Sequence, residues 1–245
     1  MAAAEHALVD DPRHASLRLV ADRVAPLALA RERTLPVHAA LASLFPEGGL
    51  KRGSVVSVDG TGATALALAV AAGPSASGSW VAVVGDPDLG LAAAREAGVA
   101  LERMLIVDPS GDRTGKSFVG NVLAALVGSV DIVLVGPAVR VRPADMRRLN
   151  ARMRERGSVI IRIGAGAQEG IDVGLSIVDH EWAGLGVGHG VLRARRVRVQ
   201  AQGRGAFSRP RATAMLLPGP EGEPVVIGER EDPHDRGADT GRLVS

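Results

Sequence analysis

Short apolar segments alternate with helical patterns through the middle of the chain. The apolar segments occupy residues 54–58, 80–84, 104–107, 131–135 and 158–163, and the helical patterns occupy residues 63–72, 89–97, 118–127 and 143–156. Short apolar strands that alternate with helices are typical of a parallel sheet covered on both faces. After Gly164 the pattern changes to strands and turns, at 175–179, 190–200 and 213–217. We therefore predict an α/β fold with a mainly parallel central sheet flanked by helices, and antiparallel strands at its C-terminal edge.

The 245 residues allow one sizeable core with terminal extensions. We expect an N-terminal helical arm at 1–34, the core at 35–219, and an acidic, disordered tail at 220–245 after the turn Pro218-Gly219-Pro220. Within the core, Gly73-Pro74 is expected to end the helix that begins at residue 63.

The N-terminal arm carries an apolar stripe at helical spacing. Its members are Leu17, Val20, Val24 and Leu27. The stripe either packs on the chain's own core or docks on another chain, and we take it as the candidate partner-binding surface.

Composition excludes several kinds of chemistry. The chain has no cysteine, which removes disulfides, thiolate metal sites and cysteine nucleophiles and fits a reducing compartment. No apolar run approaches the roughly 18 residues of a membrane span, and the first residues lack a signal-peptide pattern, so we expect a cytoplasmic protein. We expect no metal site, because Asp86 and Asp88 fit a solvated loop, and His180 and Glu181 would face opposite sides of a strand.

Arginines are concentrated near the C-terminal end of the core. Seven arginines and no acid lie between residues 191 and 215, whereas residues 221–245 hold seven acids and three arginines. The seven are Arg193, Arg195, Arg196, Arg198, Arg204, Arg209 and Arg211. They are candidate phosphate contacts for weak, salt-sensitive DNA binding, and a solvated edge strand with blocking charges is an equally open interpretation. Aromatic residues make up only 2% of the chain, too few for a base-stacking surface.

The order of these segments, from residue 35 to about 217, resembles the RecA recombinase core. The segment PEGGLKRGSVV at 46–56 looks like the family's glycine-rich lead into the first core strand. The segment AGV at 97–99, followed by MLIVDP at 104–109, resembles a helix end and the third strand, and GSVDIVLV at 128–135 resembles the strand associated with magnesium. Among RecA-like proteins the chain is similar to the ImuA type, particularly its actinobacterial form.

The expected nucleotide site departs from the RecA pattern. A phosphate loop has the sequence G-x-x-x-x-G-K-[ST] between a strand and a helix, but here Gly60-Thr61-Gly62-Ala63-Thr64 stands in that place. The loop is three residues short, and Ala63 replaces the lysine. The catalytic glutamate is missing from residues 85–88, and Gly136-Pro137 replaces the acid after the fourth strand. We predict that the chain binds no nucleotide cofactor and is not an enzyme.

A second loop keeps the rival hypothesis of an NTPase open. The segment SGDRTGKS at 110–117 differs from a phosphate loop only at Ser110, and Gly115, Lys116 and Ser117 would contact phosphates. It follows the third strand rather than the first, and Asp112 would place a negative charge beside the phosphates.

The ImuA resemblance implies a non-catalytic accessory role in damage-induced SOS mutagenesis. Its implied partners are an ImuB-like relative of Y-family polymerases and an error-prone DNA polymerase, which the chain would join as a scaffold during translesion synthesis. Self-association is a further expectation. A DNA-binding regulator of recombination is a third hypothesis.

Overall fold

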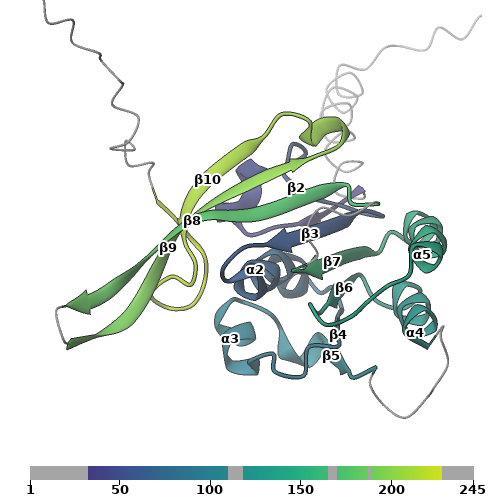
Figure 1. Cartoon of the computed structure of the whole chain (residues 1–245), viewed down its shortest axis with the longest axis horizontal. Coiled ribbons are helices and arrows are strands. Elements are labelled where there is room, and N and C mark those ends of the chain that lie inside the picture. The colour runs from purple at the N-terminus through teal and green to yellow at the C-terminus, as the bar shows by residue number, and fades with distance from the viewer. Residues whose placement is uncertain (1–32, 110–117, 165–169, 187–188, 228–245) are drawn as a thin grey trace, which may run out of the picture.

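The computed structural model describes residues 33–109, 118–164, 170–186 and 189–227. A nine-stranded sheet, in the order β11-β10-β9-β8-β3-β7-β6-β4-β5, runs through this part of the chain (Figure 1). The strands are β3 (Val55–Asp59), β4 (Val81–Val84), β5 (Met104–Val107), β6 (Ile132–Val135), β7 (Val159–Ile163), β8 (Val173–Gly186), β9 (His189–Gly203), β10 (Arg211–Leu216) and β11 (Val225–Val226). Strands β3 to β8 pair in parallel, and β9 to β11 add antiparallel strands beyond β8. The predicted fold class is confirmed.

Helices cover both faces of this sheet. The helices are α2 (Ala63–Ala76), α3 (Leu91–Glu96), α4 (Phe118–Val127) and α5 (Pro143–Arg156), with short 3-10 helices η1 (Ala39–Leu44), η2 (Leu101–Arg103) and η3 (Gly205–Phe207). A separate antiparallel ribbon joins β1 (Thr34–Pro36) to β2 (Gly49–Lys51). One buried cluster lies between the sheet and α2, and a second lies between the sheet, α4 and α5.

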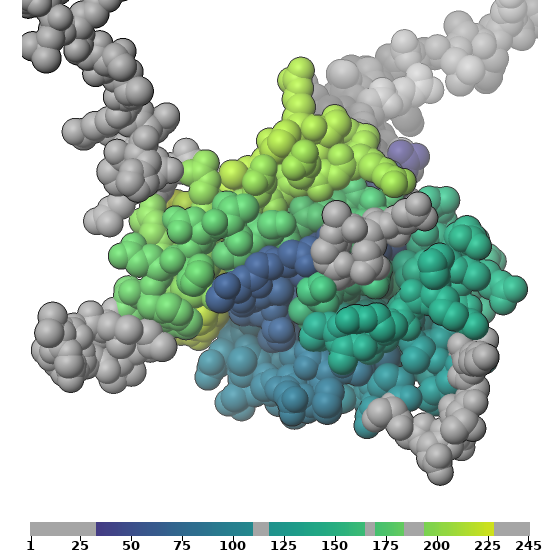
Figure 2. Space-filling view, in the orientation of Figure 1, coloured from purple at the N-terminus to yellow at the C-terminus, as the bar shows by residue number. Residues whose placement is uncertain are grey.

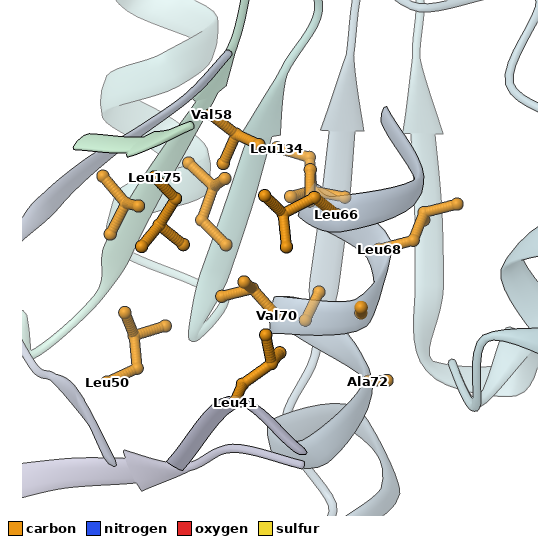
Figure 3. Close-up of a cluster of buried hydrophobic side chains, with 14 of the residues drawn as sticks. Leu41, Leu50, Val58, Leu66, Leu68, Val70, Ala72, Leu134 and Leu175 are labelled. Atoms are coloured by element: carbon orange, nitrogen blue, oxygen red, sulfur yellow. The ribbon is translucent and has the colours of Figure 1, made fainter. Parts of the chain in front are cut away.

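Alternation along β3 explains how one apolar strand serves both clusters. Val56 and Val58 belong to the cluster beneath α2, whereas Val55 belongs to the cluster beneath α4 and α5. Successive side chains of a strand point to opposite faces, so a strand covered on both sides carries apolar residues on both of its faces. Figure 3 shows Leu66 of α2 beside Leu134 of β6 in the first cluster.

The direction of β8 differs from the prediction. We expect antiparallel strands after Gly164, and this is wrong for β8, which pairs in parallel with β3 from Val56 opposite Val173 onward. The chain returns to the amino end of β3 before β8 begins, and Asp172 fixes it there. The Val55 N–H donates to Asp172 Oδ2 at 2.8 Å, and the Asp172 N–H donates to the Val55 carbonyl at 2.9 Å.

Two predicted boundaries also differ from the structure: the end of helix α2 and the end of the core at residue 219. The prediction that Gly73-Pro74 ends the helix is wrong, because α2 continues to Ala76. Pro74 lacks a backbone N–H, so the helix loses one hydrogen bond, and near the helix end this loss destabilises it little. The Ser77 N–H still donates to the Gly73 carbonyl at 3.2 Å. At the other boundary, β11 pairs with β10, so the sheet extends past residue 219.

Replacement of a fully buried leucine tests the assigned core. Leu134 is 0% exposed, so Leu134→Ala should lower the free energy of unfolding by about 2–5 kcal/mol. Leu91 is 47% exposed, and Leu91→Ala should change it by less than about 0.5 kcal/mol. Urea denaturation measures both, and equal costs would contradict the burial assigned to Leu134.

Candidate functional site

The Gly60–Thr64 segment lies where the sequence predicts it, between the carboxyl end of β3 and the first turn of α2. Gly60 and Gly62 both adopt positive φ, at 96° and 85°. The Ala63 N–H donates to the Gly60 carbonyl at 3.1 Å, which closes a tight turn. A phosphate loop instead directs consecutive backbone N–H groups outward around the phosphates. The Ala63 amide is therefore used inside the turn.

Arg195 of β9 packs directly on this turn. Its Nη1 donates to the Thr61 carbonyl at 3.1 Å, and its Nε donates to the Leu217 carbonyl at 2.9 Å. A Cβ atom at Gly62 would lie 2.6 Å from Arg195 Cζ, so any side chain there would displace the guanidinium. Arg195 Cζ also lies 5.5 Å from the centre of the Trp182 ring, a cation–π contact.

The environment of Arg195 is unusual for a charged group. The residue is 3% exposed, and burial lowers the pKa of its guanidinium. Within the described residues, its Nη2 is buried without a hydrogen-bond partner. The guanidinium lies next to the first turn of α2, the positive end of the helix dipole. The chain thus places its own cation beside the Gly60–Ala63 turn.

The loops after β4 and β6 close against each other at the carboxyl edge of the parallel strands. A Cβ atom at Gly136 would lie 2.8 Å from the Gly85 carbonyl carbon and 3.0 Å from Asp86 Cβ. Burial, and then the charge of Asp88, raise the pKa of Asp86. In the part of the chain that is described, no group of three or more His, Cys, Asp or Glu residues could hold a metal ion.

A second buried arginine, which the sequence analysis missed, lies on β7. Arg162 is 6% exposed, and burial lowers the pKa of its guanidinium, as does the charge of Arg140 to a smaller extent, whereas Asp59 raises it. The sequence did contain a signal for this residue, because Arg162 is the one charged residue in an otherwise apolar strand. A charged side chain in such a strand is stable only where polar groups surround it.

The structure separates the seven candidate DNA-binding arginines. Arg195 is buried, so its assignment as a DNA contact is wrong: its side chain is used to hold the turn. Arg196 and Arg198 stand opposite Glu181 and Asp179 across the β8–β9 pair, where unlike charges offset each other. The exposed members are Arg198, Arg204, Arg209 and Arg211, and the side chain of Arg193 lies outside the described residues.

Other predicted residues lie apart from this site or outside the description. His180 and Glu181 are exposed on β8 and pair with Val197 and Arg196 of β9. The N-terminal stripe (Leu17, Val20, Val24 and Leu27) and the rival loop with Gly115, Lys116 and Ser117 lie outside the described residues, so both stay predictions. Among the described helices, none is long and apolar enough to cross a membrane.

The parallel sheet, its covering helices and the turn at the end of β3 define a RecA-like α/β protein. The match to a solved structure agrees: the chain is similar to the crystal structure of the RadB recombinase, with a TM-score of 0.51 and 16% identity, over 76% of this chain and 96% of that chain. At this identity the likeness concerns the fold alone.

The family is shown by sequence. The chain belongs to the family of the MT3502 N-terminal domain, whose model matches residues 43–168. It is 33% identical over 152 residues to Rv3395c, an uncharacterised protein of Mycobacterium tuberculosis (strain ATCC 25618 / H37Rv), and the match covers 59% of this chain and 71% of that protein.

Alanine at Gly62 tests the contact with Arg195. A left-handed backbone alone should cost Gly62→Ala about 1–2 kcal/mol of unfolding free energy, and displacement of the guanidinium should add to that cost. Gly78 has a φ of +102° with nothing within 4 Å of its Cβ position, so Gly78→Ala measures the backbone term alone. Thermal denaturation compares the two. When Arg195 is also replaced by alanine, Gly62→Ala should lose less unfolding free energy than it does in the wild-type chain. If the difference between Gly62→Ala and Gly78→Ala stayed the same, the contact with Arg195 would be refuted.

Proposed function

We propose that this chain is a non-catalytic RecA-like accessory protein that acts by binding partners and does not bind ATP. The observation that carries the proposal is the position of Arg195, whose guanidinium lies on the Gly60–Ala63 turn and donates to the Thr61 carbonyl. A carbonyl and a buried side chain occupy the surface that phosphates require.

The energetics of phosphate binding support this proposal. Each charge-assisted contact contributes about 1.5–3 kcal/mol, which is about tenfold or more in affinity. Here Ala63 supplies no ammonium group, and its amide is bonded within the turn. A nucleotide would also have to displace Arg195 from the carbonyls of Thr61 and Leu217. We therefore expect no useful ATP affinity at this turn.

The biological role follows from the ImuA resemblance together with the RecA-like fold. We infer a scaffold of the damage-induced mutagenic complex, which joins an ImuB-like Y-family polymerase relative to an error-prone DNA polymerase during translesion synthesis. A RecA-like fold suits a role on damaged DNA, and loss of nucleotide chemistry leaves its surfaces for protein contacts. The order and spacing of the motifs at 46–56, 97–109 and 128–135 support a RecA-like core, within which the ImuA type is our inference.

ATP titration tests the non-catalytic assignment. Isothermal titration of the full chain with ATP and magnesium should show no binding in the micromolar range, and Ala63→Lys alone should not restore binding because the turn remains too short. Micromolar binding would refute the proposal. If Lys116→Ala then removed that binding, the rival NTPase loop at 110–117 would be the nucleotide site.

Association through the N-terminal stripe tests the scaffold role. Burying Leu17, Val20, Val24 and Leu27 contributes on the order of 6 kcal/mol before association costs. Leu17→Asp with Val24→Asp should abolish co-purification with an ImuB-like partner, or self-association in sizing experiments, while the melting temperature stays nearly unchanged.

A control places two acids elsewhere on the same predicted helix. Arg18→Asp with Ala25→Asp lies off the stripe by helical spacing and should leave association intact. If the stripe variant unfolds the monomer instead, the arm belongs to its own core, and the partner binds elsewhere.

A further inference from the structure

Helix α5 carries a strongly basic outer surface. Its buried residues Met146, Leu149 and Met153 face the sheet. The helix holds five arginines and two acids. The five arginines are all exposed: Arg147, Arg148, Arg152, Arg154 and Arg156. The helix lies at the right of the molecule in Figures 1 and 2.

Neighbouring groups offset only part of this charge: Glu155 lies on the same helix, and Arg148 interacts electrostatically with Asp145. Helix α4, which packs beside α5, has no charged residue. Asp145 already pairs with Arg142, whose Nε and Nη2 lie 2.8 and 3.1 Å from the two carboxylate oxygens. That hydrogen bonding lowers the pKa of Asp145, so the carboxylate stays ionised and paired. Within the described residues, none of the five arginines of α5 forms a salt bridge with a carboxylate.

Three of these arginines form a row beside a cleft. Arg148, Arg152 and Arg156 are spaced i, i+4 and i+8, so they follow one side of the helix with about 6 Å of rise between neighbours. Arg148 and Arg152 line a cleft of ≈ 250 Å³ between α4 and α5, together with Asn121 and with Asp145, the acid already bound to Arg142. The guanidinium of Arg152 lies along the end of α4, where a Cβ atom at Gly128 would be 3.3 Å from its Cζ.

We propose that this face of α5 binds the phosphate backbone of nucleic acid. Arg148 and Arg152 would contact phosphates at the cleft, and Arg156 would continue the row. Guanidinium groups bind phosphate oxygens in pairs, and a row of cations matches a polyanion in which negative charges repeat regularly.

The same surface lacks the features that a protein partner needs. Protein interfaces depend on apolar or aromatic anchors at their centre, yet the large apolar residues of α5 all face the sheet. The only other exposed residues of α5 besides its charges are Pro143, Ala144 and Ala151. Charge alone suffices for phosphate contacts, so nucleic acid is favoured over an acidic protein.

The helix dipole explains only part of this pattern. Arg154 and Arg156 lie in the last turn, where cations are stabilised by the negative helix end. Arg148 and Arg152 lie earlier in the helix and also line the cleft, so the proposal rests on these two. It does not depend on the proposed scaffold role, and it differs from the candidate contacts on β9 and β10.

Fluorescence anisotropy tests the proposal with the full chain and two labelled probes, a 40-nucleotide single strand and the matching duplex. The variant R148Q/R152Q/R156Q should weaken binding at least tenfold at about 0.1 M salt, because three phosphate contacts are lost. The slope of log K against log salt should become shallower by about one for each contact. Glutamine preserves helix propensity, and loss of the Arg156 charge at the helix end should lower the melting temperature only slightly, so the protein should stay folded.

Matched variants distinguish this surface from the others. R198Q/R209Q/R211Q removes three exposed charges from the β9–β10 region and should weaken binding less than the α5 variant does. R148K/R152K/R156K keeps the charge and should recover most of the salt slope. Polyglutamate should compete poorly with DNA for the wild-type chain.

Several results would overturn the assignment. No binding of either probe by the wild-type chain, or equal losses in the α5 and β9–β10 variants, would show that α5 is not a nucleic-acid surface. Polyglutamate that competes as well as DNA would indicate an acidic protein partner instead.

Discussion

The side chain of Arg195 joins two halves of the molecule that the chain builds far apart in sequence. It starts on β9, in the antiparallel part of the sheet, and ends on the turn that begins α2. Its second hydrogen bond, to the Leu217 carbonyl, ties the chain after β10 to the same point. Because the guanidinium rests on Gly62, the turn must have glycine there and must stay closed. The site therefore depends on one long-range contact between strand and loop.

Strands and helices between residues 54 and 163 could be predicted because their signals are local. Apolar runs of four to six residues mark β3 to β7, and the predicted limits of α4 and α5 agree with the structure. The direction of β8 could not be predicted, since it depends on Asp172 binding the backbone of Val55, 117 residues away in sequence. Alternation along a strand gives no measure of what covers each face.

In the candidate site, too, local features could be predicted and long-range contacts could not. The position of the shortened turn follows from sequence order, whereas the burial of Arg195 depends on Trp182 and Leu217, which reach it from other segments. Arginines on an expected edge strand were interpreted as surface charges, and one of them is part of the core. The basic row on α5 was visible as a helix pattern, but only the structure places it beside a cleft next to the uncharged helix α4.

A diffusible ligand holds a loop only while its concentration exceeds its dissociation constant, so a loop that depends on a ligand reports the level of that ligand. Arg195 is attached covalently to the chain, and its effective concentration at the turn is set by the fold. The contact between Arg195 and the turn therefore does not depend on the concentration of any solute, and it forms whenever the chain is folded.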